Sequence, residues 1–591
     1  MIFKKRSVNC GQLKTEDVDR KVVLNGWAST VRDLGGLIFV DVRDRFGITQ
    51  AVFEPEKNPV LAEKAKDIKT EYVVWIEGTV RLRSNPNKNI PTGLIEVVAE
   101  DFAIINKADL PPFPIEDGIE TSEEIKLKYR YLDLRRPELQ RNFIIRNQLY
   151  QIVHRYYNEN NFLEVETPVL MKSTPEGARD FLVPSRINKG KFYALPQSPQ
   201  IFKQILMMSG FDRYMQIVKC FRDEDLRSDR QPEFTQVDVE MSFIDREDIL
   251  EVTEKLFARV WKEVLNIDIE LPIRRMSYET AMNNYGSDKP DLRFDMKISH
   301  LNDGLKSCDF KVFKDIIESN GLIGAICVKG GAELSRKHLD ELTEFAKKYG
   351  AKGLAWIKYI DGDINSPIAK FLTDEEKDFI RQTCGAENGD LILISSDKKN
   401  RALTILGALR LEVASRIGIL DKVKGKYEFL WVLDFPLFEY DDETGRYYAM
   451  HHPFTSPMEE DLHLLDTDPS KVRAKAYDIV CNGAEIGGGS IRIHDNQVQK
   501  VMFDKLGLSE SEIEEKFGFL IKALKFGAPP HGGIALGLDR MVMILAGTDN
   551  IRDVIAFPKT TSGLSLMDGS PSEVDISQLN ELGVDLIKKN N

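Results

Sequence analysis

Apolar and polar residues alternate in five short runs within residues 1–107. The runs are KVVLNGWASTVRD, LIFVDVRD, ITQAVFEP, YVVWIEGTVRLRS and GLIEVVAEDFAII. Alternation with a period of two is typical of β-strands that bury one face. A helix-like segment, NPVLAEKAKDIKT, lies between the third and fourth runs. Five strands with a helix at this position predict an OB-type barrel, a fold that often binds oligonucleotides, although a small barrel without a ligand fits the same pattern.

A proline-rich stretch follows, with Pro111, Pro112 and Pro114. Proline restricts the backbone and donates no amide hydrogen bond, so residues 108–140 are predicted to be a hinge or linker. The next domain opens with the helical pattern QRNFIIRNQLYQIVHRYYNENN. The segment FLEVETPVL then predicts an apolar strand that is broken by Pro168.

Strand and helix patterns alternate between about residues 290 and 420. The predicted strands are IGAICVKGG, GLAWIKYI and LILISS, and the predicted helices are SRKHLDELTEFAKKYG, TDEEKDFIRQTCG and NRALTILGALRLEVASRIG. Ser335 is the predicted N-cap and Gly350 the predicted C-cap of the first helix. Thr373 and Glu376 have the spacing of a capping box. These patterns indicate a compact α/β unit at residues 289–421.

The segments that carry candidate chemistry lie on both sides of this α/β unit. We therefore predict one discontinuous catalytic domain, formed by residues 141–288 and 422–560, with the α/β unit inserted between its parts. Residues 561–591 are predicted to be a C-terminal extension. The expected fold class is α+β and multidomain, as a chain of 591 residues favours.

Composition narrows the class of protein. The net charge of −13 argues against a nucleic-acid partner for most of the chain, but residues 1–107 carry 17 Lys and Arg against 15 Asp and Glu. The sequence contains no apolar run of about 18 residues and no signal-peptide pattern, so no membrane segment is expected. The six cysteines are scattered and form no CxxC. This argues against a disulfide framework or a zinc site and favours a cytoplasmic location.

The stretch CFRDEDLRSDRQPEFTQVDVEMSF, residues 220–243, predicts a hairpin with charged arms. Residues two apart on a strand share a face. One face then carries Phe234, Gln236, Asp238 and Glu240, and the other carries Val237, Val239 and Met241. A solvated hairpin at a sheet edge is one interpretation. A pocket for a phosphorylated aromatic ligand is the other, because arginine binds phosphate in a bidentate manner and phenylalanine stacks on a base.

A second candidate site lies in AYDIVCNGAEIGGGSIRIH. Asn482–Gly483 is a strong type I′ turn signal, which pairs Val480 with Glu485 and places Asp478 diagonally from Glu485 on one face. Two carboxylates so close repel each other unless a cation lies between them, and Mg²⁺ suits them. Arg492 would reach the same face only if the strand contains a bulge in its glycine run.

A third site is the glycine-rich strand PPHGGIALGLDRMVMIL. Glycines that alternate with apolar residues let a ligand approach the backbone. Arg540 then opens an apolar helical run. The alternative is a buried structural arginine paired with Asp539.

These three segments resemble the motifs of class II aminoacyl-tRNA synthetases. FRDE with PEFTQVD is similar to motif 2, GIALGLDR is similar to motif 3, and the helix before VETPVL resembles motif 1. TPEGARDFLVPSR, ALPQSPQIFKQILMMSGFDRYMQIVKCFRDED, HHPFTSP and NGAEIGGGSIRIH resemble the bacterial type of aspartyl-tRNA synthetase, as does the insertion, which is similar to that family's GAD domain. The resemblance covers nearly the whole chain.

The resemblance implies an antiparallel sheet flanked by helices, an anticodon-binding OB domain, and a homodimer formed through motif 1. It implies an ATP site at the hairpin. There Arg222 and Arg540 are the catalytic arginines, Glu224 binds the adenine amino group, and Phe234 stacks on the ring. The other implied ATP-binding residues are Asp223, Gln231, Glu485, Gly537, Leu538 and Asp539, with Mg²⁺ on Asp478 and Glu485.

The resemblance also implies the amino-acid substrate. Lys203 and Arg492 are the family's pair for the side chain of L-aspartate. The residues implied for the rest of aspartate are Glu176, Ser198, Gln200, Arg222, Asp238 and His451. In the barrel, Phe39 matches a base-stacking aromatic, and Arg32, Gln50, Arg81 and Glu96 resemble anticodon-reading residues of tRNA(Asp).

One rival to an aspartate–tRNA ligase is a tRNA-independent aspartate-activating ligase of the asparagine-synthetase type, against which the intact barrel argues. Another is a binding or regulatory module without catalysis. The sequence leaves open whether tRNA(Asn) is also charged and what the inserted domain does.

Overall fold

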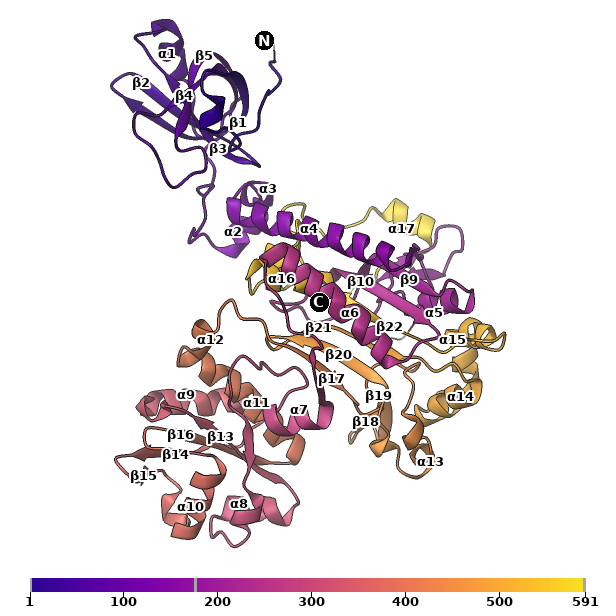
Figure 1. Cartoon of the computed structure of the whole chain (residues 1–591). Coiled ribbons are helices and arrows are strands. Elements are labelled where there is room, and N and C mark those ends of the chain that lie inside the picture. The colour runs from indigo at the N-terminus through magenta and orange to yellow at the C-terminus, as the bar shows by residue number, and fades with distance from the viewer. Residues whose placement is uncertain (1–2, 175–177, 588–591) are drawn as a thin grey trace. The chain divides into compact units, whose positions relative to one another are not determined.

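The structure is a computed structural model that describes residues 3–174 and 178–587 (Figure 1). It divides the chain into two compact units. One holds the chain up to Asn147 together with Asn550–Glu573, and the other holds Gln148–Asp549 with the segment from Val574 onward.

A closed five-stranded barrel forms the N-terminal part of the first unit. Its strands are β1 (Lys21–Leu34), β2 (Leu37–Asp44), β3 (Gly47–Phe53), β4 (Val73–Leu82) and β5 (Ile95–Asn106), in the order β1-β2-β3-β5-β4. The helix α1 (Pro59–Ala65) lies between β3 and β4, where the sequence predicts it. Apolar residues at alternate positions, such as Val40, Val42 and Ala51, fill the barrel. The predicted OB-type barrel is therefore confirmed.

Three helices follow the barrel. They are α2 (Glu123–Lys128), α3 (Arg130–Asp133) and the long α4 (Pro137–Glu159). Arg135, directly after α3, ties this segment to the barrel. Its guanidinium lies 2.9 Å from the carboxylate of Glu71 and 4.9 Å from the ring centre of Trp27.

An eight-stranded, mainly antiparallel sheet forms the centre of the second unit. Its strands, in spatial order, are β11 (Arg274–Ser277), β17 (Phe429–Leu433), β20 (Ala476–Cys481), β21 (Ala484–Ile491), β22 (His531–Gly537), β10 (Glu233–Ser242), β9 (Arg213–Phe221) and β6 (Leu163–Glu164). Only the outer pairs β11–β17 and β6–β9 are parallel. In this one sheet, four adjacent strands from the second predicted catalytic segment (β17, β20, β21 and β22) lie between strands from the first segment. The predicted α+β class is confirmed.

The segments between and after the strands of this sheet form helices. They are α5 (Gln200–Met208), α6 (Arg246–Leu265), α7 (Tyr278–Tyr285), α13 (Leu464–Thr467), α14 (Asn496–Lys505), α15 (Glu510–Leu524) and α16 (Leu538–Ala546). On the apolar face of the sheet, Glu254 of α6 accepts a 3.0 Å hydrogen bond from the indole of Trp431. The helix α5 lies on the opposite face, because Lys203 reaches Asp238 there.

A second sheet lies within residues 298–397. Its strands are β12 (Ile298–His300), β13 (Leu322–Val328), β16 (Leu391–Asp397), β14 (Ala355–Ile360) and β15 (Asp363–Asn365), in this spatial order and all antiparallel. Its helices are α8 (Lys311–Glu318), α9 (Arg336–Lys347), α10 (Asp374–Thr383), α11 (Lys399–Arg416) and α12 (Ile419–Lys422). Ser335 and Thr373 cap α9 and α10 as predicted. The elements α8, β12 and β15 were not predicted from the sequence.

Two small hairpins and a terminal helix complete the second unit. They are β7 (Leu182–Pro184) with β8 (Phe192–Ala194), β18 (Phe438–Asp441) with β19 (Arg446–Ala449), and α17 (Ile576–Leu582). No helix of the described part of the chain is long and apolar enough to cross a membrane.

Two local predictions were wrong, and one of the two interpretations of the charged hairpin is excluded. The predicted strand FLEVETPVL is shorter than expected, because it pairs with β9 only at Leu163–Glu164, with one more hydrogen bond from the amide of Val165 to Met215. The helix α9 ends at Lys347 with Lys348 as its C-cap, and Gly350 follows two residues later at φ +89°. The charged hairpin is not at a sheet edge, because β10 lies between β9 and β22.

Candidate active site

One row of residues across the central sheet joins two of the predicted sites. Asp238 on β10 lies opposite Ala535 on β22, Ala535 opposite Gly488 on β21, and Gly488 opposite Asp478 on β20. Directly opposed residues share a face. Three strand spacings of ~4.8 Å put Asp238 and Asp478 about 14 Å apart. Between them the floor consists of an alanine and a glycine, so a ligand can lie flat on the sheet.

Glycine is required at two positions of this floor. A Cβ on Gly488 would lie 2.3 Å from a carboxylate oxygen of Asp478, and a Cβ on Gly533 would lie 1.9 Å from one of Glu240. Both contacts are far inside van der Waals distance. The glycines therefore make room for the carboxylates as well as for a ligand.

The bulge that places Arg492 is present, one residue before the glycine run. Val480 pairs with Glu485, as predicted, but Ile479 pairs with Gly487, so Ile486 is the extra residue. The turn before it has Asn482 at φ +53° and Gly483 at φ +82°, as a type I′ turn requires. Because the bulge shifts the alternation by one, Arg492 comes to the same face as Glu485.

Four buried charged side chains meet at the Asp238 end of the floor. Lys203 Nζ lies 2.8 Å from Asp238 Oδ1 and 3.3 Å from Glu240 Oε2. Arg492 donates to both carboxylate oxygens of Glu240, at 2.9 and 3.0 Å. All four residues are at most 1% exposed. The structure thus brings together the predicted pair Lys203 and Arg492, and it adds Glu240, for which the sequence predicted no role.

Asp238 keeps one oxygen available. Its Oδ2 is buried and has no hydrogen-bond partner among the described residues, and the same holds for Nε2 of Gln200. Burial raises the pKa of the Asp238 carboxyl, although the charge of Lys203 opposes the rise. Burial also raises the pKa of Glu240, but Arg492 and Lys203 more than offset this, and its pKa is lowered. A cationic group that docked against Oδ2 would pair the remaining acceptor of a buried carboxylate.

Two adjacent histidines lie beside the floor, and one of them contacts the cluster. His451, the predicted residue, packs edge-on against Phe435 with its Nε2 3.9 Å from Asp478. His452 was not predicted, yet its Nε2 accepts a 2.8 Å hydrogen bond from Arg492, which also donates to Ser490 at 2.7 Å. Burial and the charge of Arg492 lower the pKa of His451 to about 4 and that of His452 well below its usual value. Both rings are therefore neutral at pH 7.

The arginine and the aromatic ring of the hairpin lie together. The guanidinium of Arg222 is 5.2 Å from the ring centre of Phe234. The strand β9 ends at Phe221, so Arg222 follows the strand, but its amide still donates to the carbonyl of Pro232 across the hairpin at 2.9 Å. Arg222 thus extends the hairpin beyond the last residue of β9.

The loop residues of the hairpin have partners of their own. Glu224 pairs with Arg230 at 3.0 Å, and Gln231, 4% exposed, donates to the carbonyl of Arg230. The amide of Asp223 donates to the carbonyl of Arg179 at 3.1 Å. These three predicted nucleotide contacts lie on the loop between β9 and β10.

Arg540 projects from the first turn of α16. It donates to the backbone carbonyl of Glu485 and lies 3.5 Å from Asp229. Asp539 instead accepts a 2.6 Å hydrogen bond from the amide of Thr235. The alternative of an Arg540–Asp539 pair is therefore wrong. The neighbouring predicted residues Gly537 and Leu538 are the end of β22 and the first residue of α16.

Asp478 and Glu485 stand at the other end of the floor. Burial, and then the charges of Glu485 and Asp288, raise the pKa of Asp478 well above its usual value. Such repulsion is what a bound divalent cation relieves, so the two carboxylates fit the predicted Mg²⁺. Within the described ranges, no group of three or more His, Cys, Asp or Glu could hold a metal by itself. A two-carboxylate site suits an ion that completes its shell with phosphates and water.

Two further residues that were predicted to bind the substrate aspartate, Ser198 and Glu176, precede α5 along the chain. Ser198 is two residues from the start of that helix, and its hydroxyl accepts a 3.3 Å hydrogen bond from the amide of Gln200. Glu176 lies outside the described residues.

The predicted anticodon residues form a connected network on the outer face of the barrel. Arg32 donates to Gln50 at 3.0 Å, Gln50 donates to Glu96 at 2.7 Å, and Arg81 donates to Glu96 at 2.9 Å. Phe39 lies opposite Arg32 in the β1–β2 pairing. An aromatic ring beside fixed donors and acceptors is the arrangement that reads unstacked bases.

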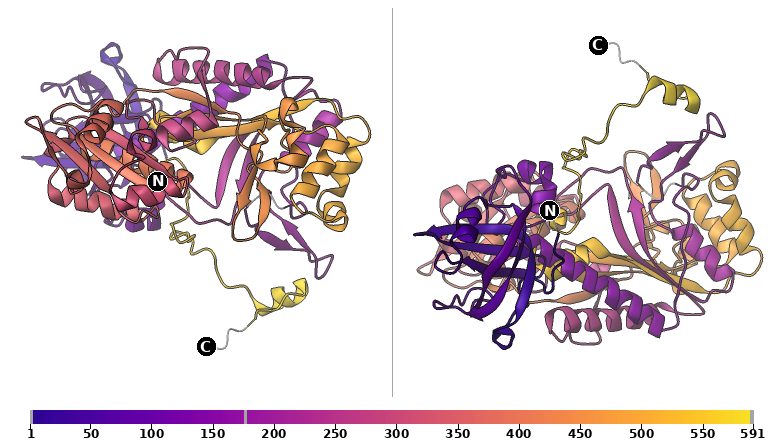
Figure 2. Two further views of the ribbon diagram at one scale, coloured as in Figure 1. Left: turned by 90° about the horizontal axis from the view of Figure 1, so that it is seen from below. Right: turned by 90° about the horizontal axis from the view of Figure 1, so that it is seen from above.

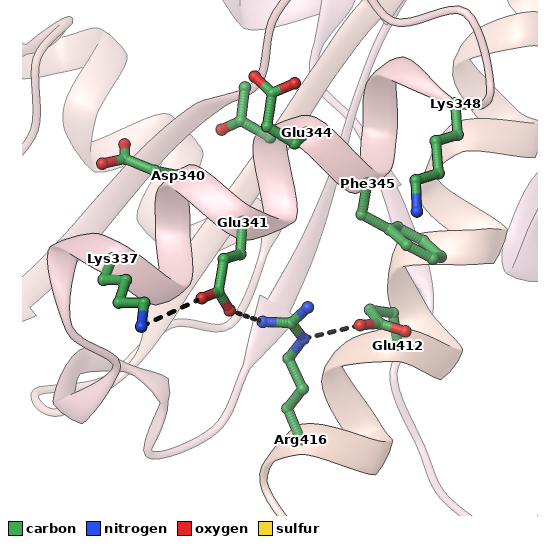
Figure 3. A pocket seen from close by; sticks show the side chains of 9 residues that line it. Lys337, Asp340, Glu341, Glu344, Phe345, Lys348, Glu412 and Arg416 are labelled. Atoms are coloured by element: carbon green, nitrogen blue, oxygen red, sulfur yellow. Dashed lines mark hydrogen bonds and ion pairs between the residues drawn. The ribbon is translucent and has the colours of Figure 1, made fainter.

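A surface hollow between α9 and α11 contains none of the predicted residues (Figure 3). Four of its charged side chains, Lys337, Glu341, Arg416 and Glu412, are paired with one another. Arg416 is 2.7 Å from both Glu341 and Glu412. This hollow therefore offers no unpaired charge around Arg416 for a ligand.

Comparisons with known proteins agree with this geometry. A family model described as "tRNA synthetases class II (D, K and N)" matches residues 122–561, and one described as "OB-fold nucleic acid binding domain" matches residues 22–105. The chain belongs to the class II aminoacyl-tRNA synthetases. The predicted resemblance is thereby confirmed.

Relatives in sequence resemble this synthetase over nearly its full length. A Caldanaerobacter subterraneus protein named aspartate–tRNA(Asp/Asn) ligase is 56% identical over 582 residues, which is 98% of each chain. A Clostridium botulinum protein named aspartate–tRNA ligase is 54% identical over 585 residues, 99% of this chain and 98% of the other.

Solved structures share the fold of this synthetase at lower identity. The asparaginyl-tRNA synthetase of Pyrococcus horikoshii, complexed with asparaginyl-adenylate, aligns over 95% of this chain and 99% of that one, with a TM-score of 0.58 and 21% identity. An aspartyl-tRNA synthetase from Entamoeba histolytica aligns over 93% and 90%, with a TM-score of 0.57 and 18% identity.

Proposed function

We propose that this synthetase is an aspartate–tRNA ligase, which activates L-aspartate with ATP and transfers it to the 3′ end of tRNA(Asp). The observation that carries the choice of amino acid is the buried cluster of Lys203, Asp238, Glu240 and Arg492. Lys203 and Arg492 supply two cations for the β-carboxylate of aspartate. Oδ2 of Asp238, which has no hydrogen-bond partner among the described residues, would accept from the substrate's ammonium group. An asparagine side chain, which is neutral, would gain much less from the two cations.

ATP would lie along the hairpin and the glycine floor. Phe234 would stack on the adenine ring and Glu224 would accept a hydrogen bond from its amino group, after release from Arg230. The α-carboxylate of aspartate then attacks the α-phosphorus in line, and pyrophosphate leaves. Arg222, and Arg540 from the opposite side, would stabilise the charge that spreads over the phosphoryl oxygens.

Asp478 and Glu485 would hold Mg²⁺ at the phosphate end of the floor. The ion, when bound, neutralises charge on the phosphate oxygens. In the second step, a hydroxyl of the 3′-terminal ribose attacks the mixed anhydride, and AMP leaves. Neither step needs a protein nucleophile, and positioning of the reactants supplies much of the rate.

The barrel is the proposed anticodon site. Phe39 would stack on a base, while Arg32, Gln50, Arg81 and Glu96 would read base edges. The relatives named for tRNA(Asp) alone and for tRNA(Asp/Asn) leave both specificities as candidates for this chain. We further propose a homodimer through the motif 1 region, where Leu163, Val169 and Leu170 are about half exposed. A ligase that charges tRNA would work in the cytoplasm, where translation takes place.

Transfer of labelled aspartate onto purified tRNA(Asp) and tRNA(Asn), measured side by side, tests the proposal. Charging of tRNA(Asp) alone indicates a discriminating ligase, and charging of both indicates a ligase whose product on tRNA(Asn) requires amidation. If neither tRNA is charged while aspartate-dependent ATP–pyrophosphate exchange persists, the tRNA-independent rival is favoured instead.

A further inference from the structure

The hairpin β7–β8 carries an unusual concentration of positive charge. Residues 181–195 read FLVPSRINKGKFYAL, with three cations and no Asp or Glu, in a chain whose net charge is −13. Arg186, Lys189 and Lys191 are all exposed, and none of them forms an ion pair with another described residue. This surface therefore has a positive potential that the hairpin itself leaves uncompensated.

Exposed aromatic and apolar side chains alternate with these cations. Tyr193 and Phe192 are 39% and 47% exposed, and Ile187 at the tip is 83% exposed. In the register of the hairpin, Val183 lies opposite Tyr193, and Lys191 lies two residues before Tyr193 on the same face. A cation and an aromatic ring on one exposed face form the combination that binds single-stranded nucleic acid.

The base of this hairpin is fixed beside the proposed active site. Gln197 donates to the carbonyl of Ala178 at 2.9 Å and to Asp180, closing the two ends of the hairpin against each other. The backbone of Arg179 pairs with that of Asp223, which lies on the loop between β9 and β10. Only four residues separate Tyr193 from Ser198, so Tyr193 lies within about 17 Å of the aspartate site along an extended chain.

Figure 2 shows this hairpin, in purple, projecting from the body of its unit, with the C-terminal helix α17 close to its tip. Gly583, directly after α17, lies next to the aliphatic part of the Lys189 side chain. A Cβ added to Gly583 would be 3.6 Å from Cβ of Lys189. Lys189 nevertheless remains exposed. The face that carries Lys191 and Tyr193 is open to a partner.

We propose that the β7–β8 hairpin is a contact surface for the acceptor end of tRNA, with Arg186, Lys189 and Lys191 against the phosphates and Tyr193 against an unpaired base or ribose. This inference rests on the proposed function, because it names the part of the RNA that the same site would receive. It assigns to the hairpin the delivery of the 3′ end to the adenylate.

The test is equilibrium binding of a tRNA(Asp) transcript to the full chain at several salt concentrations. The variant combines Arg186→Gln, Lys189→Gln and Lys191→Gln. Removal of each cation from single-stranded phosphate lowers the slope of log affinity against log salt by about 0.7, so the slope should fall by about 2 and the affinity at low salt by about tenfold. Aspartate-dependent ATP–pyrophosphate exchange should remain at the wild-type rate, because it needs no RNA.

A matched control removes the same charge elsewhere. Lys297→Gln, Lys311→Gln and Lys314→Gln combine three exposed lysines of the inserted region, and this variant should bind tRNA as the wild type does. Equal losses of affinity in both variants would reduce the effect to net charge and overturn the proposal. So would wild-type affinity and salt slope in the hairpin variant.

Two further outcomes are distinguishable. If Leu182→Ser with Phe192→Ser lowers the sedimentation coefficient to that of a monomer, the hairpin is a contact between two copies of this chain and the proposal is overturned. If the wild type binds the transcript but does not charge it, the proposed function fails while the hairpin variant still tests the surface. Absence of any binding by the wild type overturns both.

Discussion

Arg492→Lys is the change that tests the aspartate site most directly. The guanidinium makes four hydrogen bonds, two to Glu240, one to Ser490 and one to His452, all between 2.7 and 3.0 Å. Lysine keeps the positive charge, but its single ammonium cannot span both oxygens of Glu240 and at the same time hold a fixed N–H toward the β-carboxylate of aspartate, as the one remaining N–H of the guanidinium would. The variant therefore separates the geometry of the cation from its charge.

The magnitude follows from the hydrogen bonds that the substitution removes. A hydrogen bond to a charged group is worth about 1.5–3 kcal/mol, and each ~1.4 kcal/mol is a factor of ten in affinity. Removal of one such bond to the β-carboxylate predicts a KM for aspartate that is about 10- to 100-fold higher. The KM for ATP should stay unchanged, because Arg492 lies at the amino-acid end of the floor. ATP–pyrophosphate exchange at varied aspartate and ATP concentrations measures both constants.

Arg410→Lys is the matched control. Arg410 is also 1% exposed, but it donates to the backbone carbonyls of Asp291, Phe294 and Met296, away from any predicted substrate. Its replacement should lower the thermal unfolding midpoint and leave the KM for aspartate at the wild-type value. An Arg492→Lys enzyme with normal KM for aspartate would refute the assignment, as would an equal rise in KM in the control.

Four other predictions follow from the same geometry. Arg222→Ala should lower the exchange rate by at least about 100-fold, as loss of a preorganised donor to transition-state charge does, and near-normal exchange would contradict its role. Phe39→Ala should weaken tRNA charging by about tenfold at limiting tRNA, with exchange unaffected; unchanged charging would count against stacking. Asp478→Asn should raise the Mg²⁺ concentration needed for half-maximal exchange, and an unaltered Mg²⁺ titration would place the ion elsewhere. The pKa of His451 is lowered to about 4, so between about pH 6.5 and 4 the unfolded chain binds a proton there and the folded chain does not. Folding stability therefore decreases as the pH is lowered through that window. His451→Gln should flatten this part of the profile of thermal midpoint against pH, and a profile identical to the wild type would show that His451 does not cause the slope.

The sequence was sufficient where local chemistry decides the structure. The Asn482–Gly483 turn follows from two residues that accept positive φ, and the caps at Ser335 and Thr373 follow from side chains that satisfy free amides. The alternation along β10 correctly separated a polar face that includes Asp238 from an apolar face. Such features depend on neighbours within a few residues.

The sequence alone was insufficient where contacts between distant segments determine the position of a side chain. Whether Arg492 is a ligand or a structural residue depended on one extra residue, Ile486, and only the pairing of β20 with β21 shows where it lies. Glu240 had no predicted role because its partners, Lys203 and Arg492, are 37 and 252 residues away along the chain. The predicted strand FLEVETPVL was too long because its apolar residues suggested burial, whereas Leu163, Val169 and Leu170 are about half exposed in the single chain.

The position of Glu240 also bears on why the pocket has two cations. With Asp238 and Glu240 both ionised, the four buried side chains sum to zero charge, so Lys203 and Arg492 are stable in the interior before any substrate binds. An incoming aspartate adds one ammonium and two carboxylates, of which the α-carboxylate is consumed in the reaction and directed toward the phosphate. The ammonium and the β-carboxylate then cancel, and the cluster remains neutral with substrate bound. Asparagine lacks the second of these charges, so its ammonium would leave the cluster with an uncompensated positive charge in a site that is almost fully buried. Exclusion of asparagine therefore arises from the charge balance of the whole cluster as much as from the two cations that contact the side chain.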